Sequence, residues 1–445
     1  MDRSVKVAVI GAGVSGLSTA RELQREGHQV VVFEKNHRIG GIWVYDPKTD
    51  SDPLSIDPSR EIVHTSLYRS LRTNLPRPLM GFLDYPFSKE ETGDRRTYPG
   101  HEEVLRFLDK FAKEFGFHSL IRFNTEVVRV EQVNGEWVVE PKTRGSVSER
   151  ETFEAVVVCT GHNTQPRFAK IPGIEKWPGF QMHSHNYRVP EPFRDQVVLI
   201  IGLGPSGVDI SRELAKIAKE VHVVGKQFIG VDLMLENHDN TFYYTNPVEH
   251  VQEDGSVTFA DGSSIHADAI IHCTGYRYSF PFLETHGAVS VEERWVAPLY
   301  KHVFPPSLAP SLAFIGLNYL EAIFHVIELQ SKWVAKVLSG KAKLPTEEEM
   351  MISIQNLNQL LEEKGFPKEY VHTLQPFQAD YKNWLAAQCG LPPVEEWRHD
   401  MLLECMKNYF EMRDIRDLWD DHYWDAIIHG ASNGKSIIHE ASNGK

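Results

Sequence analysis

The sequence is poor in cysteine, and the few cysteines are too far apart to form a paired site. Among its 445 residues there are four, Cys159, Cys273, Cys389 and Cys405, and none belongs to a C-x-x-C pair. This spacing excludes a disulfide framework, a zinc ribbon and a thioredoxin-like dithiol. We therefore expect a reducing compartment, with a cytoplasmic location as the default.

Long apolar runs and an excess of positive charge are also missing. The longest apolar runs, such as 197–201, have the length of one strand and fall far short of the ~18 residues of a membrane-spanning helix. A glycine motif already begins at Gly11, which leaves no room for a secretory signal. Lys and Arg number 47 against 61 Asp and Glu, so the net charge of −14 disfavours a nucleic acid or an anionic membrane as partner.

The first 34 residues contain a strand, a glycine turn, a helix and a second strand. The expected strands are Lys6–Ile10 and Val30–Phe33, and the expected helix is Leu17–Arg25. The turn between them has the form G-x-G-x-x-G and consists of Gly11, Ala12, Gly13, Val14, Ser15 and Gly16. Such a turn brings the pyrophosphate of a dinucleotide to the N-terminus of a helix. Glu34 stands at the position where a carboxylate accepts hydrogen bonds from the ribose hydroxyl groups. The segment therefore predicts a dinucleotide site.

The same pattern returns in the middle of the chain. Strands are expected at Val197–Ile201 and Val221–Val224, with a helix over Val208–Lys219. The glycine turn consists of Gly202, Leu203, Gly204, Pro205, Ser206 and Gly207. The acid position is occupied by Gly225, and Lys226 follows, which favours NADP over NAD. Lys35 occupies the matching place in the first unit, so a solvent-exposed lysine remains the alternative for Lys226.

These repeats predict an α/β fold with two Rossmann-like dinucleotide-binding domains. The matching segments 156–161 and 270–275 indicate that the second unit is inserted into the first. We expect an FAD-binding part over 1–165, an NADPH-binding domain over 166–304, and a second FAD part over 305–445. This last part should contain a helical region and a mobile tail, because its near-repeat at 427–435 and 437–445 has little apolar area to bury.

Two dinucleotide sites in one chain imply electron transfer between two cofactors, most commonly a nicotinamide and FAD. A disulfide reductase would need a redox dithiol, which the cysteine spacing excludes. The H-x-H of His183 and His185 lacks a third metal ligand, so we interpret it as structure at the domain junction. Trp419, Tyr423 and Trp424 are interpreted as part of a docked amphipathic helix.

Several further motifs resemble those of the flavin-containing monooxygenases, and especially their plant S-oxygenating, glucosinolate-type group. Glu34 through Trp43 is similar to the family's E-x5-G-G-x-W segment, and 177–187 is similar to F-x-G-x-x-x-H-x-x-x-[FY], with Trp177 in place of Phe. Residues 273–276 resemble the A-T-G-Y element, and 328–333 the start of a helix that reaches the flavin. Lys226 stands where the family often has arginine. A lysine cannot bind a phosphate group in the bidentate way that an arginine can.

The resemblance implies NADPH- and O2-dependent oxygenation of a soft nucleophile through a C4a-hydroperoxyflavin, with a thioether converted to a sulfoxide. It places Asn74 beside the isoalloxazine as the catalytic residue. It implies no metal, no nucleic acid and no membrane anchor, and it leaves a homo-oligomer open. The cofactor-binding residues expected from the motifs and the resemblance are Gly11, Ala12, Gly13, Val14, Ser15, Gly16, Glu34, Lys35, Gly41, Ile42, Trp43, Thr73, Asn74, Val127 and Gln330 for FAD, and Gly202, Leu203, Gly204, Pro205, Ser206, Gly207, Asp209 and Lys226 for NADPH.

Three other functions remain open at this point. An N-hydroxylase acting on an amine or amino acid would share every cofactor motif. A Baeyer–Villiger oxygenase would have Trp in place of Tyr187 and then Pro or Asp, whereas Arg188 follows here. A non-catalytic flavoprotein sensor would bind FAD without forming a product.

Overall fold

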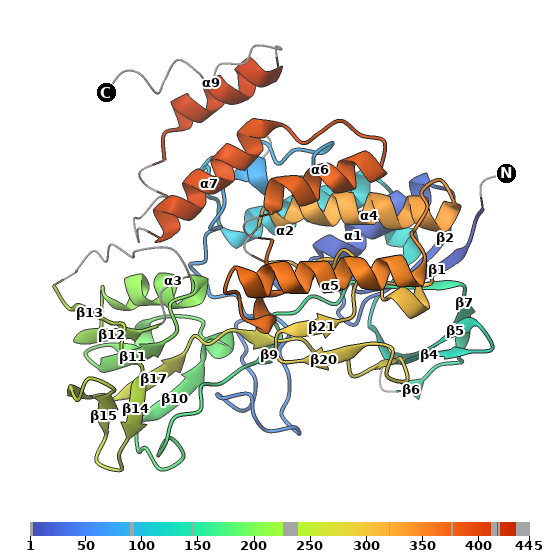
Figure 1. Cartoon of the computed structure of the whole chain (residues 1–445). Coiled ribbons are helices and arrows are strands. Elements are labelled where there is room, and N and C mark those ends of the chain that lie inside the picture. Colours follow the sequence, from blue (N-terminus) through green and yellow to red (C-terminus); the bar gives the residue numbers. More distant parts are fainter. Residues whose placement is uncertain are drawn as a thin grey trace.

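The structure is a computed structural model that describes residues 3–89, 93–143, 146–225, 239–319, 321–374, 377–410, 416 and 419–432. It is a mixed α/β fold containing two five-stranded sheets in which all neighbouring strands are parallel (Figure 1). The middle strand of each sheet ends at one of the two glycine turns, so the sequence repeats correspond to the two halves of the molecule.

The first sheet is central to the larger half. Its order is β22 (Leu312–Phe314), β8 (Ala155–Val158), β1 (Lys6–Ile10), β2 (Gln29–Phe33) and β3 (Ile121–Arg122). Alternate residues of β1 point to opposite faces, so Val7 and Val9 join one core while Ala8 and Ile10 join another. Both faces are covered, which explains why the strand is apolar from Val7 to Ile10.

Helices cover one face of this sheet and an antiparallel sheet covers the other. The helices are α1 (Val14–Arg25), α2 (His101–Glu114) and α4 (Ile323–Ser339), which lie on the same side in Figure 1. The second layer consists of β4 (Thr125–Val133), β5 (Glu136–Thr143), β6 (Ser146–Val147), β7 (Glu151–Phe153) and β19 (Leu283–Glu284). Trp137 and Phe153 from this layer pack against Ala8 and Ile10.

The second parallel sheet repeats this design on a smaller scale. Its order is β10 (Phe180–His183), β17 (Ala269–His272), β11 (Val197–Ile201), β12 (Glu220–Val224) and β13 (Thr241–Tyr244). Val198 and Ile200 pack toward α3 (Pro205–Leu214), whereas Leu199 and Ile201 pack toward the antiparallel strands β14 (Val248–Val251), β15 (Ser256–Phe259) and β16 (Ser264–His266).

The chain enters and leaves the second half through two neighbouring segments. β9 (Gln165–Pro166) and β18 (Tyr276–Arg277) pair as an antiparallel ribbon. Beyond it, Tyr278, Phe280 and Leu299 belong to the core of the first half, and β19 pairs with β4. The chain therefore returns to the core of the first half directly after β18.

The helix ends also differ from the sequence prediction. α1 begins at Val14 rather than Leu17, and α3 spans Pro205–Leu214 rather than Val208–Lys219. Both helices start inside the glycine motif because its last residues already have helical backbone. α3 ends early because the Asn240 amide donates to the carbonyls of Ala215 and Ala218 (3.0 and 3.2 Å), which directs the chain into β12.

The C-terminal region is helical, as predicted. It contains α5 (Glu347–Glu363), α6 (Gln378–Gln388), α7 (Glu396–Phe410) and α9 (Asp421–Ser432), and a small ribbon of β20 (Ser290–Glu292) and β21 (Trp295–Ala297) precedes it. Trp424 is buried and stacks on Trp419 with ring centroids 5.5 Å apart, which agrees with a docked helix. The near-repeat beyond Ser432 lies outside the described residues. Within those residues, no helix combines the length and apolar character needed to cross a membrane.

Candidate functional site

The first glycine turn has no space for larger side chains. Gly11 has a φ of +104°, and a Cβ added there would lie 2.6 Å from the carbonyl oxygen of Cys159. A Cβ on Gly16 would lie 1.8 Å from the Gly11 carbonyl oxygen, so α1 packs directly on the turn. The helix begins after Gly13, and no side chain caps it. Its first N–H groups are therefore available to an anion such as a pyrophosphate.

Glu34 fastens this turn to the end of β2. Its carboxylate is buried and accepts hydrogen bonds from the N–H groups of Ala12 and Asn36, each at 2.8 Å. Burial raises the pKa of the Glu34 carboxyl, and the two N–H groups oppose this shift. Each oxygen keeps a second lone pair that can accept a ribose hydroxyl.

The second glycine turn is built in the same way. Gly202 has a φ of +115°, and a Cβ there would lie 2.2 Å from the carbonyl oxygen of Cys273. A Cβ on Gly207 would lie 2.0 Å from the Gly202 carbonyl oxygen. α3 begins after Gly204 without a side-chain cap, and a Cβ on Gly204 would meet no atom within 4 Å. The turn therefore presents an open backbone to a ligand.

The segment that contains Asn74 lies at the edge of an extended pair. Arg72 and Gly100 form an antiparallel bridge, and the Thr73 N–H donates to the Pro99 carbonyl at 2.9 Å. Thr73 is buried, whereas Asn74 is exposed, and the Asn74 amide has no hydrogen-bond partner in the described part of the chain. An asparagine that served only to close a local turn would use its side chain there. The Asn74 amide is therefore open to solvent or to a ligand.

The Gln330 side chain makes three hydrogen bonds to neighbouring protein groups. It is buried in α4, accepts from the Gly316 N–H at 3.1 Å, and donates to Asn318 and Tyr381, each at 2.8 Å. A Cβ on Gly316 would lie 2.6 Å from the Ser15 hydroxyl oxygen. Gln330 therefore holds the Gly316 loop against the first glycine turn.

The other predicted FAD residues have different surroundings. Gly41, Ile42 and Trp43 form a short 3-10 helix, and Gly41 lies against Gly13. Lys35 is exposed. Val127 is buried in β4, within the core of the first half. Among the predicted NADPH residues, Ser206 is half-buried in the first turn of α3, and Lys226 lies outside the described residues.

The Asp209 carboxylate binds two side chains that come from distant parts of the sequence. It accepts from the Tyr68 hydroxyl at 2.7 Å and from the Arg416 guanidinium at 2.6 Å. Sequence reasoning missed Arg416, because it lies in a region without a motif and is brought to α3 only by the fold.

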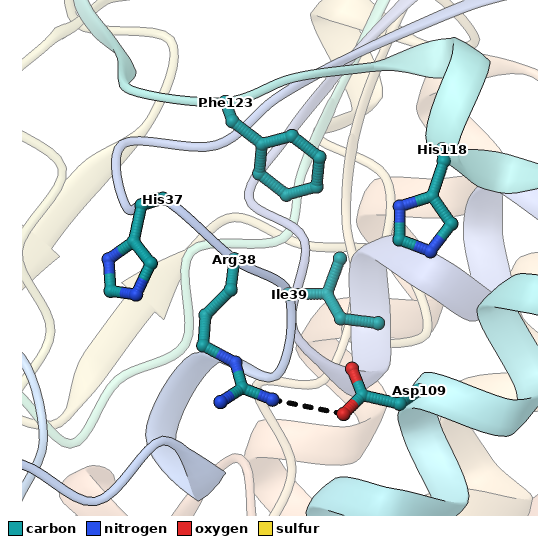
Figure 2. Close-up of a pocket in the computed structure, with 6 residues that line it drawn as sticks. All are labelled: His37, Arg38, Ile39, Asp109, His118 and Phe123. Atoms are coloured by element: carbon teal, nitrogen blue, oxygen red, sulfur yellow. Dashed lines mark hydrogen bonds and ion pairs between the residues drawn. The ribbon is translucent and has the colours of Figure 1, made fainter.

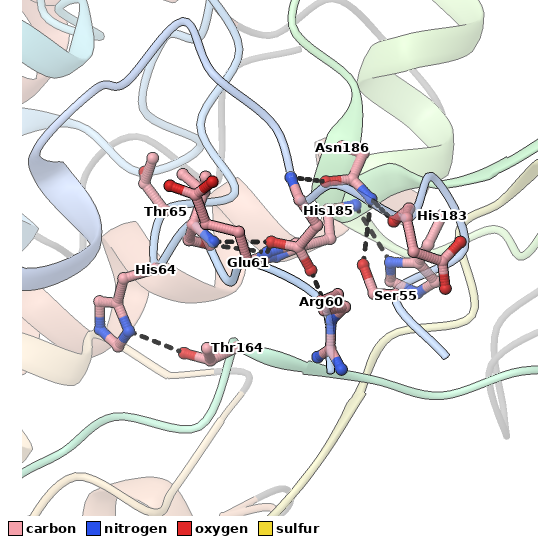
Figure 3. A network of polar contacts seen from close by, with 12 residues as sticks. Ser55, Arg60, Glu61, His64, Thr65, Thr164, His183, His185 and Asn186 are labelled. Carbon is pink, nitrogen blue, oxygen red and sulfur yellow. Dashed lines mark hydrogen bonds and ion pairs between the residues drawn. The ribbon is translucent and has the colours of Figure 1, made fainter. Parts of the chain in front are cut away.

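The H-x-H pair lies in a buried polar network at the junction of the two halves (Figure 3). The His183 ring contacts the Gly275 carbonyl at 3.1 Å, and the His185 ring contacts the Val63 carbonyl at 2.9 Å. Burial lowers the pKa of His183 to about 3, so it is neutral at physiological pH. In the described ranges, no group of three His, Cys, Asp or Glu side chains is arranged to hold a metal ion. The contacts agree with the domain-junction interpretation.

Asp50 is the charged centre of this network. It is buried, pairs with Arg60 at 2.8 Å, and accepts from the Val63 N–H at 2.7 Å. Burial alone would raise the pKa of Asp50, but the hydrogen bonds from His185, Val63, Ser55 and Arg60 hold it well below its usual range.

We predict that Asp50→Asn lowers the free energy of unfolding by ~1–3 kcal/mol at pH 7, because Arg60 loses its buried partner. A carboxyl with a depressed folded pKa stabilises the fold above its unfolded pKa of ~3.9, and this contribution disappears as the pH falls through the folded value. The difference in the free energy of unfolding between wild type and variant should therefore become smaller below pH ~4. Urea unfolding at several pH values measures it, with the exposed Asp425→Asn as control. A difference that stayed constant down to pH 2 would contradict the assignment.

A separate pocket opens on the surface of the first half. Its volume is about 390 Å³, and it is lined by His37, Arg38, Ile39, Asp109, His118 and Phe123 (Figure 2). Arg38 and Asp109 form an ion pair of 2.9 Å across its edge. It contains none of the predicted site residues, so it is not part of the candidate site.

Comparison with known proteins identifies the family. The family described as "FMO-like: Flavin-binding monooxygenase-like" matches residues 4–245 and 242–394. The chain belongs to this family of flavin-containing monooxygenases, whose members use FAD and NADPH. Both glycine turns fit such dinucleotides, because each combines a close backbone turn with an uncapped helix start.

The chain is similar to plant members of the family over nearly its whole length. It is 50% identical over 425 residues to "Flavin-containing monooxygenase FMO GS-OX2" of Arabidopsis thaliana, covering 94% of this chain and 93% of that protein. The structure of S-allyl-L-cysteine S-oxygenase from Allium sativum is 51% identical, with a TM-score of 0.92 and coverage of 97% and 99%. The structure of Tmm from Pelagibacter sp. strain HTCC7211 is 26% identical, with a TM-score of 0.78 and coverage of 91% of both chains.

Proposed function

We propose that this monooxygenase is an S-oxygenase that converts a thioether to a sulfoxide. One oxygen atom of O2 is transferred to sulfur, the other becomes water, and NADPH with one proton supplies the two electrons. The observation that carries the proposal is the 51% identity, over almost the entire chain, to an S-oxygenase that acts on S-allyl-L-cysteine.

We assign FAD to the larger half and NADPH to the smaller half. The FAD domain would comprise residues up to about 165 and from about 277 onward, and the NADPH domain would lie between them. The paired strands β9 and β18 and the separate cores of the two halves support these limits. This arrangement corresponds to two Rossmann-like domains, one inserted into the other.

The roles of the residues follow from their positions. The turn from Gly11 to Gly16 would hold the FAD pyrophosphate, with Glu34 at a ribose, and the turn from Gly202 to Gly207 would hold that of NADPH. When bound and reduced, FAD supplies the activation of O2. The Asn74 amide would donate a hydrogen bond to the reacting group. The Gly316 loop, which Gln330 holds against the first glycine turn, would form part of the wall of the FAD site. No protein acid–base pair is needed in this scheme.

Product analysis tests the proposal. The purified protein, loaded with FAD, should convert thioethers with an amino-acid head group to sulfoxides in the presence of NADPH and air. A matched panel of thioethers and amines, analysed by mass spectrometry, separates S-oxygenation from N-hydroxylation. Hydroxylamine products with no sulfoxide would replace the proposal by N-hydroxylation, and NADPH oxidation without any oxygenated product would contradict both.

A further inference from the structure

Hydrogen bonds connect helix α3, which follows the second glycine turn, to the segment that leads to Asn74. On α3, Asp209 accepts from the Tyr68 hydroxyl at 2.7 Å. One turn further along, Glu213 accepts from the hydroxyls of Ser70 and Tyr187, the latter at 2.5 Å. Both acids of this helix face therefore bind hydroxyl groups. Two of these belong to residues 68–70, a segment that comes from the first part of the chain and whose Tyr68 packs into the core beside α3.

Arg416 adds a second connection between these two parts. Its Nη2 lies 2.7 and 2.6 Å from the two carboxylate oxygens of Asp209, and its Nε donates to the Thr73 carbonyl at 3.2 Å. The side chains of Arg416 and Asp209 are 16% and 14% exposed, so water screens their ion pair only partly. One planar guanidinium thus spans from α3 to the residue directly before Asn74.

These contacts connect α3 to the Thr73–Asn74 peptide. Asp209 lies about one helical turn beyond the start of α3 at Pro205, and the Thr73 carbonyl belongs to the peptide that joins Thr73 to Asn74. A displacement of α3 relative to Thr73 would move the nicotinamide side of the site away from the flavin side. Reaction between two bound groups requires separations of ~3–3.5 Å, and a misplacement of ~1 Å can cost ~100-fold in rate.

We propose that Arg416 is a positioning residue. It holds the NADPH-binding helix α3 and the Thr73–Asn74 peptide in the relative position required for flavin reduction. The proposal rests on the assignment of NADPH to the second turn and FAD to the first. Arg416 touches neither reacting group in this scheme. It acts through Asp209 and the Thr73 carbonyl. The Tyr68 hydroxyl adds a further hydrogen bond to the same Asp209 carboxylate.

The test compares Arg416→Ala, Arg416→Lys and Tyr68→Phe with the wild type, all loaded with FAD. Arg150→Ala is the matched control, because Arg150 forms an exposed ion pair with Glu140 at 2.8 Å, away from α3. Anaerobic stopped-flow measurement gives the limiting rate of flavin reduction and the NADPH concentration at half-saturation. Hydrogen exchange of the 68–74 backbone amides gives a readout that does not depend on activity.

We expect Arg416→Ala to lower the limiting rate ~10- to 100-fold, with a smaller change in NADPH half-saturation. FAD content and the flavin spectrum should stay normal, and amides 68–74 should exchange faster. Arg416→Lys retains one charged donor and should recover part of the rate, and Tyr68→Phe should show a smaller loss. Arg150→Ala should match the wild type in each measurement.

Two results would overturn the positioning role. The first is an unchanged limiting rate in Arg416→Ala. The second is an equal loss of FAD in Arg416→Ala and Arg416→Lys, with normal reduction of the fraction that keeps FAD. A wild-type protein that dithionite reduces but NADPH does not would contradict the proposed function itself, so the two failures are distinguishable.

Discussion

Asn74→Ala should keep its FAD and its reduction by NADPH, yet release hydrogen peroxide instead of sulfoxide. In the structure the Asn74 amide is exposed and makes no hydrogen bond within the described residues, so its removal should leave the fold intact. If the amide donates to the oxygen-carrying group in the loaded enzyme, its loss removes one hydrogen bond to a buried reactive centre. Such a bond is worth ~1–3 kcal/mol, which corresponds to a roughly 5- to 150-fold change in rate.

The measurement is the yield of peroxide and of sulfoxide per NADPH oxidised. Asn408→Ala is a suitable control, because Asn408 lies on α7 and, among the residues that the structure describes, bonds only Glu404 of the same helix. Anaerobic reduction by NADPH should be the same in both variants. Full coupling of NADPH oxidation to sulfoxide in Asn74→Ala would remove Asn74 from the mechanism.

Gly204→Val should abolish reduction by NADPH while FAD stays bound. The backbone of Gly204 has a φ of −80° and a ψ of −175°, which valine adopts readily, and a Cβ there meets no protein atom within 4 Å. The side chain would instead occupy the space that a pyrophosphate needs. We expect NADPH binding to weaken by at least ~100-fold, equivalent to about 2.7 kcal/mol.

Titration of the oxidised protein with NADP+ measures this loss, and the flavin spectrum reports FAD content. Gly204→Ala, with a smaller side chain, should show a smaller effect. Gly207→Val serves as the contrast, since a Cβ there would lie 2.0 Å from the Gly202 carbonyl oxygen and should disturb the fold itself. Unimpaired NADP+ binding by Gly204→Val would show that the second turn does not hold the coenzyme.

Sequence reasoning was accurate where the structure is locally determined. β1, β2, β11 and β12 fall within one residue of the predicted strands, because a short apolar run rich in β-branched residues is itself typical of a buried strand. The early end of α3 was missed, since it depends on an amide bond from Asn240 that the helical pattern does not contain.

The larger errors involve contacts between distant segments. The return of the chain after β18 depends on its pairing with β9, more than 100 residues earlier, and proline-rich connections alone do not indicate it. Arg416 reaches Asp209 across 207 positions of sequence. The family resemblance pointed to Asp209, but no comparable signal surrounds Arg416.

The ribbon of β9 and β18 has a consequence for how such a chain can be assembled. Because its two strands are hydrogen-bonded neighbours, the ends left by removing the segment between them lie one strand spacing apart, about 4.8 Å. A short turn can join them without disturbing the first parallel sheet, whose strands all lie outside the removed segment. The same closeness gives the excised segment adjacent ends. In its chain connections the smaller half is therefore a single insertion, whose two ends meet at one place on the larger half.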